Sequence, residues 1–289
     1  MRQYTITALL LLVVCFSGSH VAHAQAIAEA SKVRFLLDQS YQPHPVDDYD
    51  TKMTRVDWYL PTSVKDYPTL IWFHGGALRE GDKADEIARI VARHFSENGV
   101  AVASVNYRMS PKVKYPTYLE DSARSLAYVL NKVEEFGGSR QKVFVSGHSA
   151  GGYIASMLAC DPGYLKAVNL SPSDFAGYLP ISGQMITHST VRAERGLPET
   201  KPVIDEAAPA FHISRDVPPM ICIVGTQDLP ARLEENIYFV ASMKTIKNPN
   251  ISSLVVEGRD HTTIASKISQ PNDTVAKAMM EFISKHSSH

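Results

Sequence analysis

Residues 143–160, VFVSGHSAGGYIASMLAC, constrain the fold of this 289-residue chain more than any other stretch. The run starts with the β-branched and aromatic side chains of a short buried strand, and it ends with a helical stretch over 153–159. Between them lies Gly-His-Ser-Ala-Gly, a G-x-S-x-G pattern centred on Ser149. A serine in a glycine-rich turn is often only a turn residue. Between a strand and a helix, however, the pattern predicts a strained turn that exposes the Ser149 hydroxyl at the tip of the strand.

The rest of the chain alternates buried strands with helices. Most of the expected strands are apolar throughout, as in strands that are covered on both faces. This alternation predicts an α/β fold with a mostly parallel central sheet and helices on both faces. A strand over 53–60 alternates polar and apolar residues, which indicates an outer antiparallel strand. The sequence does not decide whether residues 26–38 form a helix or an edge strand. Residues 42–50 are expected to be loop. The other expected strands are 69–73, 100–105, 143–145, 176–181, 220–224 and 253–257, and the expected helices are 83–98, 119–136, 153–159, 233–246 and 275–286.

The N-terminus has the layout of a secretory signal peptide. Arg2 precedes an apolar run over residues 6–16, and an A-x-A site ends at Ala24. This combination predicts cleavage after that alanine. The apolar run is well short of the ~20 residues that a membrane span needs, which argues against a stable membrane anchor. We therefore expect a signal peptide over 1–24, export to the periplasm or the medium, and a single domain over 25–289.

The composition limits the kinds of molecule that the protein can be expected to bind. The net charge is −1 and the pI is near 6.8, so nothing indicates binding to nucleic acid or to an anionic membrane. Cys15 leaves a lipoprotein alternative open, although Val14 stands where such a site needs a small residue. Cys160 closes a predicted helix and Cys222 lies in a predicted core strand, which favours two buried free thiols over a disulfide. No Cys/His spacing indicates a metal, no cofactor is expected, and the oligomeric state is left open.

Residues that can activate a serine follow the predicted strands. A serine hydroxyl attacks only when a base takes its proton, and imidazole suits that role near neutral pH. A carboxylate must then orient the ring and stabilise the imidazolium. Ser149, Asp228 and His261 each follow a strand, and the carboxyl ends of parallel strands meet at one edge of a sheet. Their order along the chain is that of the α/β-hydrolases, so we predict them as nucleophile, acid and base.

Position along the chain also favours His261 over the other histidines as the base, and Asp228 over the other carboxylates as the acid. His74 opens a glycine loop, where bracing that loop is the expected role. His148 flanks the serine but is expected to point elsewhere on the turn and to pack. Asp260 points away from the site if His261 points in. The positions of the following residues also favour neither catalytic role: His44, His94, His188, His212, His286, His289, Asp174, Asp205 and Glu206.

The same edge of the sheet is expected to hold an oxyanion hole. A developing alkoxide needs two or three backbone N–H donors aimed at it. Ala150, directly after the serine, provides one of them. The His-Gly-Gly-Ala loop over 74–77 follows a buried strand, and glycine lets its backbone come close to a substrate. Gly76 and Ala77 are therefore predicted to provide the other donors.

Five segments carry a resemblance to a known family: HGG (74–76), NYRMSPKVKYPTYLED (106–121), GHSAGG (147–152), VPPMICIVGTQD (217–228) and GRDH (258–261). They resemble the hormone-sensitive-lipase-like branch of the α/β-hydrolases, and most of all its bacterial feruloyl-esterase-like and kynurenine-formamidase-like serine esterases. The resemblance covers nearly the whole mature chain. It implies a serine carboxylesterase fold, with the nucleophile, acid, base and oxyanion roles on the residues named above.

The chain departs from the branch at two positions, and both bear on the substrate. Ala77 stands where the branch has the third glycine of its HGGG motif. The branch's serine motif GDSAG reads GHSAG in this chain, with His148 in place of aspartate. Both departures fit the feruloyl-esterase-like and formamidase-like side. We expect an exported esterase for a small acyl or aromatic acyl ester, for example a polysaccharide-derived one. A small-amide hydrolase of the arylformamidase type is the alternative, and a non-catalytic binding protein is the weakest interpretation.

The connection over 182–219 predicts an open acyl pocket. Lids in this fold are usually inserted after the strand that follows the nucleophile helix, which places them in this segment. The segment is under forty residues, includes a crossover, and is broken by three prolines. No amphipathic helix in it is apolar enough to cover a lipid site. We therefore expect a small or absent lid and a preference for short or flat aromatic acyl groups.

Overall fold

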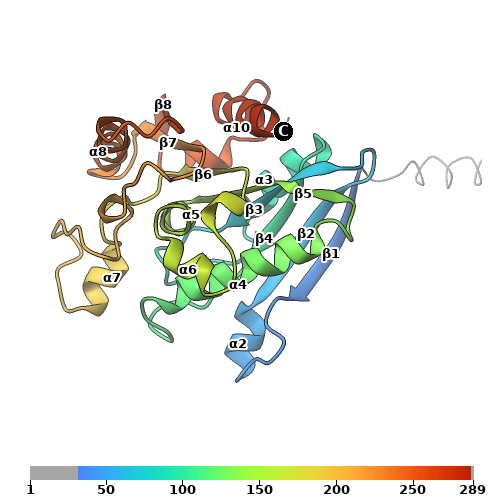
Figure 1. Ribbon diagram of the computed structural model, residues 1–289, viewed down its shortest axis with the longest axis horizontal. Coiled ribbons are helices and arrows are strands. Elements are labelled where there is room, and N and C mark those ends of the chain that lie inside the picture. The colour runs from blue at the N-terminus through green and yellow to red at the C-terminus, as the bar shows by residue number, and fades with distance from the viewer. Residues whose placement is uncertain (1–31, 288–289) are drawn as a thin grey trace, which may run out of the picture. The chain divides into compact units, whose positions relative to one another are not determined.

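The computed structural model describes residues 32–287, and within them one eight-stranded sheet forms the centre (Figure 1). Its strands are β1 (Val33–Ser40), β2 (Arg55–Pro61), β3 (Tyr67–Phe73), β4 (Ala101–Val105), β5 (Gly138–His148), β6 (Gly177–Ile181), β7 (Met220–Gln227) and β8 (Ile251–Asp260). They lie in the order β1-β2-β4-β3-β5-β6-β7-β8. β2 is antiparallel to both of its neighbours, and all the other neighbouring strands are parallel.

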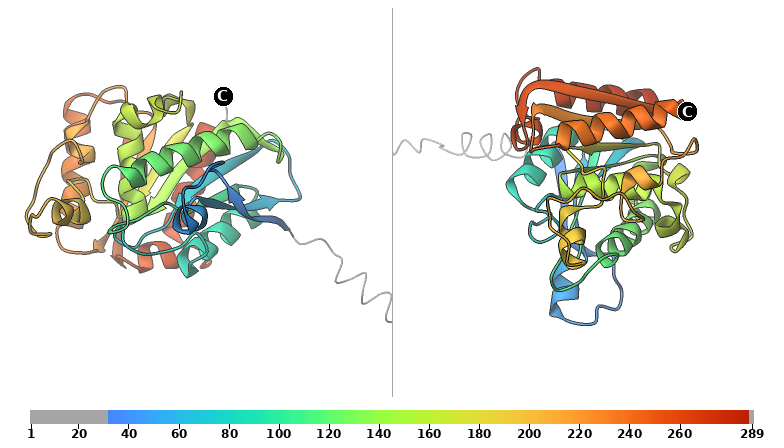
Figure 2. Two further views of the ribbon diagram at one scale, coloured as in Figure 1. Left: turned by 90° about the horizontal axis from the view of Figure 1, so that it is seen from below. Right: turned by 90° about the vertical axis from the view of Figure 1, so that its left-hand side faces the viewer.

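Helices lie on both sides of this sheet (Figure 2). α4 (Thr117–Lys132), α5 (Ala150–Cys160) and α8 (Arg232–Thr245) contribute to the core on one face, and α3 (Glu86–Glu97) and α10 (Thr274–His286) to the core on the other. None of the helices within 32–287 is both long and apolar enough to cross a membrane. The shorter helices are α2 (Asp48–Met53), α6 (Pro162–Lys166), α7 (Ser189–Glu194) and α9 (Thr263–Ser266), with 3₁₀ turns η1 (Pro172–Asp174) and η2 (Pro209–Phe211).

The apolar run of β3 is explained by burial on both faces. Leu70 and Trp72 pack into the core under α3 and α10, whereas Ile71 and Phe73 pack into the core under α4 and α5. All four side chains are fully buried. Because successive side chains of a strand point to opposite faces, a strand between two helical layers must be apolar at every position.

The turn from β5 into α5 is the most strained feature near the centre of the sheet. Ser149 has φ 57° and ψ −114°, a combination that costs a non-glycine residue on the order of 1–3 kcal/mol. The surrounding glycines explain how the turn is tolerated. A Cβ on Gly151 would lie 1.9 Å from the carbonyl oxygen of Phe73, and a Cβ on Gly147 would lie 2.6 Å from the same oxygen. The start of α5 therefore packs directly on the backbone at the end of β3.

The prediction of an α/β-hydrolase sheet, mostly parallel and with a small or absent lid, is confirmed by this topology. The undecided N-terminal stretch is an edge strand, β1. The loop predicted over 42–50 is wrong at its end, where α2 begins. The Asp47 side chain accepts a hydrogen bond from the Asp50 amide at 2.7 Å and so caps that helix.

Two further predictions concern the cysteines and the N-terminus. Cys160 and Cys222 are buried and free, as predicted, and burial raises the pKa of each thiol, that of Cys222 to about 12. The signal peptide over 1–24 lies outside the described residues and stays a prediction. So does the start of the single domain at residue 25, although the described residues form one compact unit.

Substituting Gly151→Ala should destabilise the protein, because a Cβ there meets a backbone oxygen that no side-chain rearrangement can move. We expect a loss of at least about 1–3 kcal/mol in the free energy of unfolding, typical of overpacking. Urea unfolding measures it. Gly163→Ala is the matched control, because its Cβ would meet only the flexible Asp161 side chain, at 3.0 Å. Equal midpoints for the two variants would contradict the prediction.

Candidate active site

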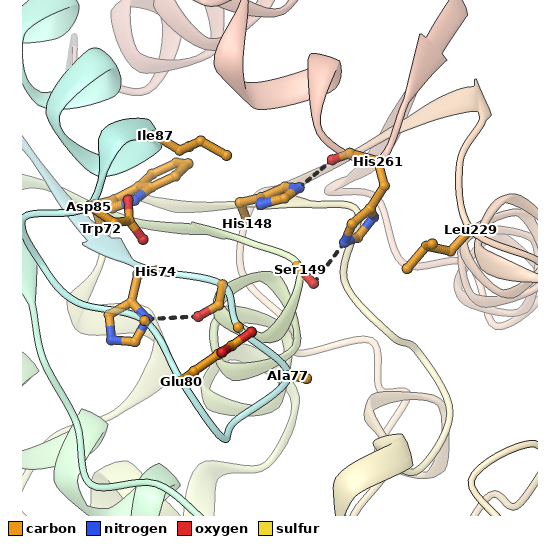
Figure 3. Close-up of a pocket in the computed structure, with 13 residues that line it drawn as sticks. Trp72, His74, Ala77, Glu80, Asp85, Ile87, His148, Ser149, Leu229 and His261 are labelled. Carbon is orange, nitrogen blue, oxygen red and sulfur yellow. Dashed lines mark hydrogen bonds between the residues drawn. The ribbon is translucent and has the colours of Figure 1, made fainter.

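Ser149, His261 and Asp228 form a continuous hydrogen-bonded chain at the carboxyl edge of the sheet. The Ser149 Oγ lies 2.9 Å from the Nε2 of His261 (Figure 3). The His261 Nδ1 lies 2.7 Å from the Oδ1 of Asp228. Ser149 sits on the turn after β5, Asp228 follows β7, and His261 follows β8. The sheet thus brings together the three residues that the sequence singled out. In this geometry the imidazole can take the serine proton while Nδ1–H stays bonded to the carboxylate.

The Asp228 carboxylate is shielded from solvent and fully hydrogen-bonded. Its side chain is 0% exposed, its Oδ1 also accepts from the Leu229 amide at 2.7 Å, and its Oδ2 accepts from the Ser182 hydroxyl at 2.5 Å. Burial by itself raises the pKa of Asp228, but the hydrogen bonds from His261 and Ser182 outweigh it and hold that pKa below its usual value. The carboxylate therefore stays charged and can stabilise an imidazolium.

Ser182 is a supporting residue that the sequence analysis missed. It follows β6 directly, and its backbone has φ 51°. Its amide donates to the Ile223 carbonyl at 2.8 Å, and its own carbonyl accepts from the Arg232 guanidinium. The rule that selected the other site residues, a polar side chain just after a buried strand, also applies to Ser182 and would have found it.

His148 is buried and packs, as predicted, and its ring lies against the loop that carries His261. Its Nε2 lies 2.6 Å from the carbonyl oxygen of His261, and the two ring centroids are 4.8 Å apart (Figure 3). Burial, and next the nearby His261 charge, lower the pKa of His148 to about 3. The ring is therefore neutral at the pH at which a histidine base works.

The loop over 74–77 approaches Ser149 from the end of β3. Gly76, Ala77 and Leu78 all have positive φ, at 104°, 55° and 60°. A Cβ on Gly76 would lie 2.0 Å from the Glu80 carbonyl oxygen, so only glycine fits there. Within residues 32–287, the amides of Gly76, Ala77 and Ala150 donate to no other protein group. These three amides are thus available as the predicted oxyanion donors.

Contacts from two other parts of the chain hold this loop. The Tyr107 hydroxyl donates to the His74 carbonyl at 2.9 Å, and the Thr190 hydroxyl donates to the Ala77 carbonyl at 2.5 Å. The Ser110 amide donates to the Leu78 carbonyl at 2.9 Å. The loop is therefore fixed in a strained conformation by its neighbours, which is a requirement for a preorganised oxyanion hole.

An open cavity of about 580 Å³ lies beside Ser149. Trp72, Ile87 and Leu229 give it apolar walls, and the carboxylates of Glu80 and Asp85 also line it (Figure 3). No lysine or arginine is among the described residues that line it. A site of this character can take an uncharged or cationic group and disfavours an anionic one.

The other candidates from the sequence lie outside the hydrogen-bonded chain. His74 braces its loop, as expected: its Nδ1 is 2.7 Å from the Gly75 oxygen and its ring stacks on Tyr107. The Asp260 carboxylate accepts from the amides of Thr262 and Thr263 instead of from His261. In the described part of the chain, no cluster of three or more His, Cys, Asp or Glu side chains has the arrangement of a metal site.

Family models match the chain in two overlapping segments. The BD-FAE model matches residues 56–169, and the model of the prolyl oligopeptidase family matches residues 119–289, more than half of the chain. The chain belongs to the prolyl oligopeptidase family. Among the curated relatives of the chain is esterase LipC of Mycobacterium tuberculosis. It is 26% identical to this chain over 220 residues, which cover 70% of this chain and 54% of LipC. The chain spans about half the length of the curated relatives it matches.

Solved structures of esterases share the fold. A truncated carbohydrate esterase from gut microbiota has a TM-score of 0.73 at 17% identity, covering 91% of this chain and 99% of that one. Esterase B from Lactobacillus rhamnosis also has a TM-score of 0.73 at 17% identity, covering 93% of this chain and 91% of that one. Together with the family match, these relatives confirm that the chain resembles hormone-sensitive-lipase-like α/β-hydrolases, and the relatives and structures named here are esterases.

Replacing Asp228→Asn should lower kcat by on the order of 10⁴, because an amide cannot hold the imidazole in the tautomer that accepts the serine proton. Asp260→Asn is the matched control, since its carboxylate only caps the turn after His261. Steady-state turnover of a chromogenic ester measures both. A large loss in Asp260→Asn with none in Asp228→Asn would reverse the assignment of the acid.

Proposed function

We propose that this protein is an exported serine carboxylesterase that works through an acyl-enzyme intermediate. The observation that carries the proposal is the hydrogen-bonded chain from Ser149 through His261 to the shielded Asp228 side chain. The amides of Gly76, Ala77 and Ala150, which donate to no other group within residues 32–287, are the proposed oxyanion donors. A nucleophile with its base, an orienting acid and an oxyanion hole make up the machinery of acyl transfer.

Each step of the reaction has a residue in place. Ser149 Oγ attacks the ester carbonyl carbon and gives its proton to His261 Nε2, while the carbonyl oxygen takes up negative charge near the three amides. The C–O bond to the alcohol then breaks, and His261 protonates the departing alkoxide. Water attacks the acyl-serine by the same route in reverse and releases the acid. Asp228 stays ionised throughout and stabilises the imidazolium.

The cavity supports a small acyl or flat aromatic acyl group. Its walls offer three apolar side chains, and the connection over 182–219 contains only α7 and η2, so no long helix covers the opening. An acyl chain longer than the walls gains little of the ~0.8 kcal/mol that each buried methylene supplies. The carboxylates of Glu80 and Asp85 favour an uncharged polyol, such as a polysaccharide-derived alcohol, over an anionic substrate. One structural neighbour is named a carbohydrate esterase.

A small-amide hydrolase is the second candidate, because the same machinery cleaves activated amides. The family model that matches residues 119–289 carries a peptidase name, which favours including amides in any test. Amide hydrolysis requires His261 to protonate a far poorer leaving group than an alkoxide. The open cavity does not distinguish the two candidates, whereas a panel of substrates does.

Export is supported by the sequence of residues 1–24, with its basic start, apolar core and A-x-A site. Expression in a bacterial host with an intact Sec pathway should therefore give a mature protein that begins at Gln25 and is found outside the cytoplasm. Fractionation followed by mass spectrometry of the N-terminal peptide measures this. A cytoplasmic protein that retains Met1 would overturn the export proposal, and a lipid-modified Cys15 would replace cleavage after Ala24 with lipoprotein processing.

The ester proposal predicts that kcat/KM for p-nitrophenyl esters is highest for acetyl to butyryl groups and falls for longer chains. Hydroxycinnamoyl esters should also be hydrolysed, whereas N-formyl anilines and p-nitroanilides should react at least about 100-fold more slowly. A fluorophosphonate probe should label the protein and not Ser149→Ala. Metal chelators should leave turnover unchanged, because no step of the proposed reaction uses a metal.

Three outcomes would count against parts of this proposal. A kcat/KM that peaks at decanoyl or longer chains would exclude the small acyl site. Faster hydrolysis of formamides than of matched esters would favour the amide alternative. A succinate half-ester that reacts as well as its neutral methyl ester would show that Glu80 and Asp85 do not select against negative charge.

A further inference from the structure

His148 links three parts of the active site that lie far apart in the sequence. It directly precedes Ser149 and so belongs to the nucleophile turn. Its Nε2 lies 2.6 Å from the main-chain oxygen of His261, on the loop that carries the base (Figure 3). A Cβ on Gly75 would lie 3.4 Å from the Nδ1 of His148, so the other edge of the ring lies beside the glycine loop. The side chain is buried, with the whole residue 6% exposed.

The direction of the hydrogen bond follows from the chemistry of the two groups. A main-chain carbonyl can only accept, so the Nε2 of His148 carries the hydrogen and donates it to His261. Burial keeps the imidazole neutral, and a neutral ring with a hydrogen on Nε2 has none on Nδ1. A second charge is thereby kept away from His261 while that residue becomes an imidazolium.

The hydrogen bond restrains the base at a point that nothing else in the described chain holds. Asp260 binds the amides of Thr262 and Thr263, on the far side of His261 along the chain. Asp228 holds the His261 ring at Nδ1. The main-chain oxygen of His261 is bonded by His148 alone among the described residues.

We infer that His148 is a positioning residue: it donates a hydrogen bond to the His261 carbonyl and so fixes the loop that carries the base relative to Ser149. The inference rests on the proposed function, because it needs Ser149 and His261 to act as nucleophile and base. A displacement of about 1 Å between reacting groups can slow a reaction about 100-fold, so restraint of this loop is sufficient to matter.

Five groups that can carry a charge lie around His148. His261 comes from the loop after β8, Asp228 from the end of β7, and Arg232 from α8. Glu80 and Asp85 line the same cavity. A neutral replacement leaves all five in place, so changes in rate report the lost donor instead of a changed charge.

Two neutral variants separate the donor from the bulk of the ring. His148→Gln places an amide N–H near the position of Nε2, whereas His148→Leu fills similar space without a donor. The measured quantity is the second-order rate of Ser149 labelling by a fluorophosphonate, from pH 5 to 9. We expect the leucine variant to be 10- to 100-fold slower than the wild type at every pH, and the glutamine variant to be within about 5-fold of the wild type. With an ester substrate, the loss should appear in kcat and not in KM.

The matched control is His212→Leu. The Nε2 of His212 donates to the Glu206 carbonyl at 2.8 Å, a bond of the same kind in the connection over 182–219, away from the cavity. Its loss should leave the labelling rate unchanged. A leucine variant at 148 that labels as fast as the glutamine variant would overturn the inference.

A second measurement does not depend on any variant folding. Imidazole ¹⁵N NMR of the wild type should show His148 as the Nε2–H tautomer, with no titration above about pH 5. The Nδ1–H tautomer, or titration near pH 6–7, would also overturn the inference. Because labelling needs no ester, a protein that labels but hydrolyses no ester would refute the proposed function and still test the role of His148.

Discussion

The close packing of α5 on the end of β3 is the constraint on which the rest of the site depends. Gly147 and Gly151 let the strand, the turn and the helix meet at the Phe73 carbonyl, with no room for a Cβ at either glycine. This packing forces Ser149 into its strained backbone conformation and aims its hydroxyl out of the sheet. It also leaves the Ala150 amide free, at the first turn of α5. The predicted nucleophile and one predicted oxyanion donor thus both follow from this close packing.

Electrostatics at the site depends on keeping one charge buried and a neighbouring group neutral. Burial of the Asp228 side chain raises its pKa, yet hydrogen bonds from His261, Ser182 and the Leu229 amide hold that pKa below its usual value. His148, in contact with the same base, has its pKa lowered to about 3 and is uncharged. A carboxylate without these donors would tend to be protonated, and a charged His148 would oppose the imidazolium. The two environments thus place a negative charge on one side of His261 and a neutral ring on another.

The parts of the structure that follow from local patterns could be predicted from the sequence. The apolar run of β3 and the glycines around Ser149 determine a buried parallel strand and a tight turn. The strand ends then place Ser149, Asp228 and His261 at one edge. Contacts between distant segments were not predictable in this way. The direction of the His148 ring depends on where β8 places His261, and the register of β8 against β7 is set by tertiary packing. The cap of α2 by Asp47 is a local signal, but Pro43 and Pro45 just before it favour a loop in the sequence.

The connection over 182–219 braces the site where a lid would otherwise cover it. Its Thr190 hydroxyl bonds the Ala77 carbonyl, and its Glu199 pairs with Arg79 at 2.8 Å. The exposed ion pair adds little stability, but the bond to Ala77 holds a residue whose positive φ is unfavourable. A glycine at this position, as in the HGGG motif of the branch, would adopt that conformation without strain and would be more mobile in the unfolded chain. Alanine therefore makes the loop dependent on its brace. A movement of the connection that broke the Thr190 bond would release Ala77, whose amide is a predicted oxyanion donor.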